Sequence, residues 1–166
     1  MTDRVLVLIR HAKTVPIAAT DSERELTDRG HRDAGQAAAW LAGIVPAVDL
    51  AVVSPAVRAR ETWADLAAMV AADDLLVDER IYDNTIEDMF AVLGDVPDDV
   101  TTLLLVGHSP SVHALAVALD DGTGDPDSSA VLASDYPTCG IAIFDVPGSW
   151  SDIADRRATL RTFAIP

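Results

Sequence analysis

Cysteine is almost missing from this chain. Cys139 is the only one, so no disulfide can form within the chain and no thiolate metal cluster can be assembled. Such a composition is usual in a reducing compartment. Basic residues are also few, because 12 lysines and arginines face 27 aspartates and glutamates, for a formal net charge of −15. Polyanions would repel this chain, so we expect no binding to nucleic acid or to an anionic membrane surface.

Long hydrophobic runs are lacking as well. The apolar run at residues 5–9 is far too short for a secretory signal or a membrane span, and Arg10 ends it. The sequence therefore predicts a cytoplasmic protein.

Aromatic side chains are scarce, at 5% of the 166 residues, although 49% of the chain is hydrophobic. Alanine, valine and leucine supply most of that content, which suits helices packed closely on a parallel sheet. The length is enough to close one core and lies in the usual range for one domain. We expect a single domain, residues 1–166, present as a monomer or a weak dimer.

Strand-like apolar runs alternate with helix-like segments along the chain. Strands are expected at residues 5–9, 48–54, 75–77, 101–106, 140–146 and, at an edge, 159–165. Helices are expected at residues 27–44, 54–70, 85–93 and 111–119, and a mobile surface loop at residues 120–129. This alternation predicts an α/β fold with a mostly parallel sheet flanked by helices on both faces.

Side chains at the helix starts predict how three of these helices begin. Thr27 is placed to cap the first helix, Ser54 the second, and Thr85 with Asp88 resembles a capping box. Apolar side chains at helical spacing, ending at Ile44 in the first helix, mark the faces expected to pack on the sheet.

Three of the expected strand ends carry side chains that can bind an anion. Arg10 and His11 end the first strand, Ser54 ends the second four residues before Arg58, and His108 follows the fourth. Carboxyl ends of parallel strands meet at one edge of a sheet, so these residues can converge although nearly a hundred positions separate them. Two arginines and two histidines would then line one pocket.

That set of side chains suits phosphoryl transfer. Guanidinium groups such as Arg10 and Arg58 bind phosphoryl oxygens through charge-assisted, often bidentate hydrogen bonds. His11 can attack phosphorus only as a neutral imidazole, and the arginine charges would lower its pKa. Its other ring nitrogen is expected to donate to a backbone carbonyl, and His108 to donate to the phosphoryl oxygens. The scheme requires no metal and no cofactor.

The same three segments resemble the signatures of a known family. Residues 10–14 (Arg-His-Ala-Lys-Thr), 54–62 (Ser-Pro-Ala-Val-Arg-Ala-Arg-Glu-Thr) and 106–110 (Val-Gly-His-Ser-Pro) are similar, in order and spacing, to motifs of the histidine phosphatase superfamily, which includes the phosphoglycerate mutases. The small size, the Arg-His-Ala-Lys opening and residues 21–27 resemble the compact SixA branch of phosphohistidine phosphatases.

The resemblance implies a phosphoglycerate mutase-like fold and a role for each site residue. His11 would be the phosphorylated nucleophile, Arg10 and Arg58 would clamp the phosphoryl group, and His108 would complete the pocket. The implied activity is metal-independent removal of phosphate from phosphohistidine in a protein. Two alternatives stay open: a phosphatase for small metabolites such as phosphosugars or nucleotides, and a regulatory module that binds phosphate without turnover.

The group that would protonate the leaving group is not fixed by the sequence. Many larger members of the family have an insertion after the third strand that supplies an acid, whereas this chain has only a short segment there. The candidates are Glu79, Asp83, Glu87, Asp21 and Glu23. A phosphoramidate leaving group has a basic nitrogen of its own, so a protein acid is less necessary for it. The short segment also predicts a shallow, open pocket.

Lys13 and Thr14 follow the first motif directly. They could contact the phosphoryl group, but lysines in loops are usually exposed to solvent, so both interpretations stay open.

Two other catalytic classes fit less well. Residues 107–111 nearly match the nucleophile elbow of serine hydrolases, but Ser111 replaces the final glycine and no histidine follows His113. A zinc site is weakly indicated, since no two histidines have the i, i+4 spacing with an intervening glutamate.

Overall fold

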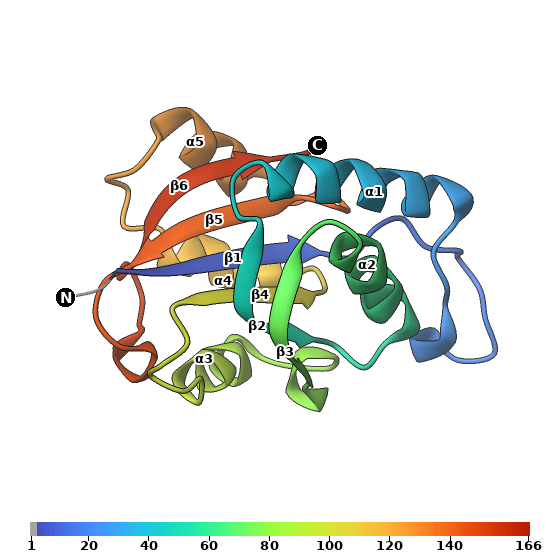
Figure 1. Cartoon of the computed structure of the whole chain (residues 1–166), viewed down its shortest axis with the longest axis horizontal. Coiled ribbons are helices and arrows are strands. Elements are labelled where there is room, and N and C mark those ends of the chain that lie inside the picture. The colour runs from blue at the N-terminus through green and yellow to red at the C-terminus, as the bar shows by residue number, and fades with distance from the viewer. Residues whose placement is uncertain (1–2) are drawn as a thin grey trace.

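A six-stranded sheet with the strand order β3-β2-β4-β1-β5-β6 forms the centre of the molecule (Figure 1). The computed structural model describes residues 3–166. The strands are β1 (Arg4–Arg10), β2 (Ala47–Val53), β3 (Ala71–Val77), β4 (Thr102–Gly107), β5 (Ile141–Val146) and β6 (Thr159–Ala164). Strands β1 to β4 run parallel, whereas β5 and β6 are antiparallel to their neighbours. The predicted α/β class with a mostly parallel sheet is confirmed.

The helices cover both faces of this sheet, as predicted. They are α1 (Asp28–Ala42), α2 (Val57–Ala67), α3 (Ile86–Gly94), α4 (Ser111–Leu119) and α5 (Pro126–Ser134). Along β1, Leu6 and Leu8 pack with α3, α4 and α5, while Val7 and Ile9 pack with α1 and α2. A strand whose alternate side chains enter two apolar layers must be hydrophobic throughout, which is why β1 appears as an unbroken apolar run.

The predicted caps hold at two helices and fail at a third. The Thr27 hydroxyl accepts a hydrogen bond from the Gly30 amide at the start of α1, and Thr85 and Asp88 form the capping box of α3. Helix α2 begins later than predicted, at Val57, and no side chain caps it. The Ser54 hydroxyl contacts the His108 ring instead.

Three further expectations need correction. Helix α1 ends at Ala42, so Ile44 lies beyond it and is exposed. Helix α5 begins inside the segment expected to be a mobile loop: Asp125 caps it and Pro126 occupies its first turn. The third strand begins at Ala71 and lies at the sheet edge, where most of its side chains are exposed.

The register of the central strands brings the predicted site segments together. Arg10 on β1 is paired with Gly107 on β4, and the amide of His11 donates to the Gly107 carbonyl. On the other side of β4, the amide of Ser54 donates to the Val106 carbonyl. Three segments from distant parts of the sequence therefore end side by side.

Within residues 3–166, none of the helices has the length and apolar character needed to cross a membrane.

Candidate active site

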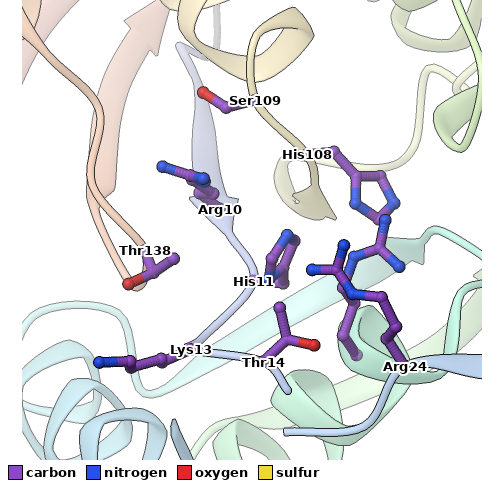
Figure 2. A pocket seen from close by; sticks show the side chains of 9 residues that line it. Arg10, His11, Lys13, Thr14, Arg24, His108, Ser109 and Thr138 are labelled. Atoms are coloured by element: carbon purple, nitrogen blue, oxygen red, sulfur yellow. The ribbon is translucent and has the colours of Figure 1, made fainter. Parts of the chain in front are cut away.

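A cavity of about 320 Å³ lies at the carboxyl ends of β1, β2 and β4. It is lined by Arg10, His11, Lys13, Thr14, Arg24, Arg58, His108, Ser109 and Thr138. Figure 2 shows His11 at its centre, with Arg10 on one side and His108 and Arg24 on the other. All four residues predicted to bind or attack a phosphoryl group are therefore in one pocket. Lys13 and Thr14 line it as well.

The His11 ring is held in one tautomer. Its Nδ1 lies 2.8 Å from the backbone oxygen of Ala12, and a carbonyl only accepts, so Nδ1 carries the proton and donates. The neutral ring then has a lone pair on Nε2. The predicted hydrogen bond to a backbone carbonyl is confirmed.

The His11 ring is also kept neutral. Burial lowers its pKa to about 4, with smaller contributions from the charges of Arg58, Arg10 and Arg24, while the bond to Ala12 acts in the opposite direction. The predicted direction is right, but burial outweighs the arginine charges as its cause. At neutral pH the ring is a free base, which is the form that can act as a nucleophile.

Thr62 on α2 fixes the backbone that orients His11. The Ala12 amide donates to the Thr62 hydroxyl at 3.0 Å, and that hydroxyl donates to the Arg58 carbonyl at 2.7 Å. Ala12 and Thr62 have no exposed surface, so solvent cannot replace the first bond. Thr62 thus connects the segment of the first motif to that of the second.

Replacing Thr62 with valine should therefore destabilise the fold by roughly 1–3 kcal/mol, because the buried Ala12 amide would lose its acceptor. Urea unfolding measures this. The matched control is Thr62→Ser, which keeps the hydroxyl and should lose less. Equal losses in both variants would mean that the methyl group, not the hydrogen bond, stabilises the site.

His108 lies beside His11, with 5.2 Å between the ring centroids. Burial, then the neighbouring His11 and Arg58, lowers its pKa to about 3. Its Nε2 is 2.7 Å from the Ser54 hydroxyl oxygen, and its Nδ1 is buried. Both histidines in the pocket are therefore neutral at pH 7.

The two arginines are partly engaged by the protein itself. Arg10 donates through Nη1 to the Tyr136 carbonyl at 2.9 Å. Arg58 donates to the Asp21 carbonyl at 2.8 Å and to its carboxylate at 3.0 Å. Arg58 is only 7% exposed, because Asp21 covers its guanidinium.

Three buried nitrogens of this pocket have no hydrogen-bond partner among residues 3–166: Arg10 Nε, Arg58 Nε and His108 Nδ1. Buried polar groups are nearly always paired, so unpaired nitrogens on side chains that line a cavity indicate a site for a hydrogen-bonding partner. The cavity also contains four cationic side chains in a chain of net charge −15. Its chemistry therefore suits a small anion with several oxygens.

The comparisons with known proteins agree with this geometry. The family model described as histidine phosphatase superfamily (branch 1) matches residues 6–88, which contain Arg10, His11 and Arg58. This chain belongs to the histidine phosphatase superfamily.

The relatives of this histidine phosphatase match it over nearly its whole length. An uncharacterized protein of Mycobacterium tuberculosis is 39% identical over 95% of this chain and 99% of its own. A structure from Nakamurella multipartitia, proposed to be the phosphohistidine phosphatase SixA, is 32% identical over 98% of this chain and 95% of its own, with a TM-score of 0.86. A structure of the protein histidine phosphatase SixA with tungstate shares the fold, with a TM-score of 0.78 at 23% identity over 96% of this chain and 95% of its own. The chain lies in the SixA-type branch, as its motifs predicted.

One of the five candidate acids of this phosphatase lies beside the pocket. Asp21 contacts Arg58, and its carboxylate accepts from the Tyr82 hydroxyl at 2.5 Å. These bonds, that of Tyr82 first, lower the Asp21 pKa, so the group is a carboxylate and a poor proton donor. Asp21 is not itself part of the cavity lining, and neither are the other four candidates, Glu23, Glu79, Asp83 and Glu87.

Sequence reasoning missed two residues that shape this histidine phosphatase site. Arg24 lines the cavity and donates to the Asp21 carboxylate at 3.1 Å. Tyr82 lies edge-on to His108, at 5.6 Å between ring centroids, and its ring faces Arg58. Arg24 stands in the stretch 21–27 that resembles the SixA branch, which was a usable signal, whereas nothing in the pattern around Tyr82 indicated a role.

Glu61 fastens the loop that carries Asp21 and Arg24. Its carboxylate accepts from the Leu26 amide at 2.7 Å, just before α1 begins. The segment after β1 is thus attached to α2 near both of its ends, at Ala12 and at Leu26.

The two buried histidines should make the fold labile to acid. Their pKa values of about 4 and about 3 lie below the 6.5 of an exposed histidine, so between these limits the unfolded chain binds more protons. Stability therefore rises with pH in this window and is lost as pH falls from 6.5 toward 4, by roughly 3 kcal/mol for His11, and protonation of His108 adds to this loss.

Urea unfolding across this pH range measures the slope. The double variant His11→Asn/His108→Asn should show a much shallower loss than the unmodified chain. His31→Asn is the control, because its bond to Asp65 raises the His31 pKa, which gives the opposite sign. An unchanged slope in the double variant would contradict the assignment of the acid lability to these two rings.

Proposed function

We propose that this protein is a metal-independent phosphatase that works through a phosphohistidine on His11 and acts on phosphohistidine in a protein. The observation that carries the proposal is the state of His11. It is neutral, its Nδ1 donates to Ala12, and it lies among cationic side chains, so Nε2 offers a lone pair inside an anion site.

The reaction has two displacements. In the first, His11 Nε2 bonds to phosphorus as the bond from phosphorus to the substrate nitrogen breaks, and the substrate imidazole leaves with the electron pair. In the second, water attacks the phosphorylated His11, which releases inorganic phosphate and restores the neutral ring. Arg10 and Arg58 stabilise the charge on the three equatorial oxygens in both transition states, and His108 donates to one of them.

The leaving group supports phosphohistidine as the substrate. Asp21, the candidate acid nearest the pocket, is paired with Arg58 and Tyr82, and its pKa is lowered. An alkoxide leaving from a phosphate ester needs a proton from an acid, whereas an imidazole leaving group takes its proton on its own basic nitrogen. A site without a ready acid therefore favours a phosphoramidate over an ester.

Rates of phosphate release from a phosphohistidine peptide, a phosphosugar, a nucleotide and an aryl phosphate test this proposal. We expect the peptide to be preferred, the rate to be unaffected by a chelator, and all turnover to be lost in His11→Asn. A preference for the small esters would support the metabolite phosphatase instead. Binding of phosphate without any turnover would support the regulatory module.

The remaining expectations concern partners and place. A phosphorylated protein is the proposed partner, because a histidine side chain on a protein surface could enter an open pocket of this kind. A cytoplasmic location is proposed from the single buried cysteine. Cell fractionation and sedimentation would test the location and the expected monomer or weak dimer.

A further inference from the structure

Ser54 is a buried polar residue to which the mechanism above assigns no role. It follows β2 and has no exposed surface. Its hydroxyl oxygen lies 2.7 Å from His108 Nε2 and accepts a longer bond, 3.3 Å, from the Ala56 amide. The hydroxyl is thus in contact with one ring nitrogen of a residue that lines the phosphate pocket.

The hydrogen-bond inventory decides which partner donates. A serine hydroxyl has one hydrogen, and the Ala56 amide uses one of its lone pairs. Within residues 3–166, His108 Nε2 is the only acceptor in reach of that hydrogen. If Nε2 carried a proton, the hydroxyl hydrogen and the lone pair of the buried Nδ1 would both lack a partner, whereas a proton on Nδ1 leaves only that one N–H unpaired. The hydroxyl therefore donates to Nε2.

The hydrogen bond from Ser54 to Nε2 also fixes the protonation of Nδ1, the other ring nitrogen of His108. A neutral imidazole with an unprotonated Nε2 carries its hydrogen on Nδ1. In His108 this nitrogen is buried and has no partner among the described residues, while the residue as a whole is 7% exposed and lines the cavity beside His11 (Figure 2). Nδ1 is thus an unpaired donor on a ring that belongs to the lining of an anion pocket.

We propose that Ser54 is a positioning residue that holds His108 as the Nδ1–H tautomer, so that the ring donates a hydrogen bond to the phosphoryl group. Phosphoryl oxygens only accept, so the opposite tautomer would turn a lone pair toward them and repel them. The role in turnover rests on the function proposed above, whereas the tautomer itself does not.

The charge state of His108 makes this selection necessary. Burial, with the neighbouring His11 and the charges of Arg58 and Arg10, lowers its pKa to about 3, against a smaller opposite effect of Asp21. A protonated imidazolium would donate from both nitrogens whatever its neighbours. A neutral ring donates from one nitrogen only, so a neighbouring group must determine which of the two nitrogens carries the proton.

The first test reads the tautomer directly. The ¹⁵N chemical shifts of a histidine ring distinguish a protonated from an unprotonated nitrogen. At neutral pH we expect His108 to carry its proton on Nδ1 in the unmodified chain and in Ser54→Thr, which keeps the hydroxyl, and to lose this preference in Ser54→Ala. A proton on Nε2 in the unmodified chain would overturn the proposal without reference to any activity.

The second test measures whether anion binding and turnover depend on Ser54. Orthovanadate affinity and turnover should each fall roughly ten- to hundredfold in Ser54→Ala. This is somewhat less than the decrease seen when an oxyanion donor is removed altogether. Both quantities should recover in Ser54→Thr. Ser134→Ala, on an exposed side chain, is the control. Unchanged vanadate affinity in a folded Ser54→Ala would overturn the positioning role.

The two proposals can fail separately. An Nδ1–H tautomer with Ser54-dependent vanadate binding, but without turnover that depends on His11, would end the proposed function and leave this inference standing.

Discussion

Replacing His11 with asparagine is expected to abolish turnover, by roughly a millionfold in kcat, as in other enzymes that lose the nucleophile of a covalent mechanism. Asparagine has no atom that can replace Nε2 as the attacking group. Its amide can still donate a hydrogen bond, so the contact that His11 makes with the Ala12 carbonyl need not be lost. The variant should therefore remain folded.

A phosphorylated intermediate distinguishes loss of the nucleophile from a general disturbance of the pocket. Brief mixing of the unmodified protein with labelled phosphohistidine peptide, followed by an alkaline quench that preserves phosphoramidates, should leave label on His11. His11→Asn should carry none but should still bind orthovanadate through its arginines.

The matched control is His31→Asn, on the exposed side of α1, where the ring bonds to Asp65. It should retain both label and turnover. Label that persists in His11→Asn, or turnover within a factor of about ten of the unmodified protein, would remove His11 from the role of nucleophile.

The convergence of this site could be predicted because it depends on strand order more than on side-chain detail. Arg10, Ser54 and His108 each stand at the end of an apolar run, and parallel strands place such ends along one edge. The pairing of Arg10 with Gly107 places the carboxyl ends of β1 and β4 side by side. Burial of His11 follows from the same position, at the end of a strand covered on both faces.

The covering of Arg58 could not be predicted in this way. Asp21 belongs to a short 3-10 turn, η1 (Asp21–Glu23), and Tyr82 directly follows another, η2 (Glu79–Ile81). Neither segment has the periodicity from which contacts can be inferred, so their meeting at Arg58 depends on loop geometry alone. The role of Ser54 was hidden for a different reason, since a serine before proline at a helix start is also typical of an N-cap.

Helix α5 shows that composition can conceal a local signal. Residues 120–129 contain many aspartates and glycines, which favoured a loop. Asp125 and Pro126 were nevertheless the usual pair for an N-cap and a first helical position.

Replacing Arg58 with alanine should reduce kcat/KM roughly a thousandfold or more, as does the loss of other arginines that contact a transferring phosphoryl group. The matched control is Arg60→Ala, two residues along the same helix, where the side chain is exposed and a near-normal rate is expected. Arg58→Lys should lie between the two, because lysine restores the charge without the bidentate geometry.

The fold should tolerate the loss of Arg58 although its side chain is buried. Its charged partner, Asp21, has a half-exposed side chain that keeps its bonds to Tyr82 and Arg24 when the guanidinium is removed. No buried charge is then left unpaired, so the free energy of unfolding should change by only about 1 kcal/mol. Urea unfolding of Arg58→Ala checks this before its kinetics are interpreted.

The pH dependence of Arg58→Ala separates two ways in which this residue could act. If it served only to keep His11 neutral, its removal would raise the His11 pKa, and activity would recover where the ring is unprotonated anyway, above pH 6.5. Burial is the largest cause of the lowered His11 pKa, and it persists without Arg58. We therefore expect the deficit in kcat/KM to be as large at pH about 8 as at pH about 6, because what is missing is a contact with the transition state. Recovery to within about tenfold at the higher pH would show that Arg58 acts through His11 instead.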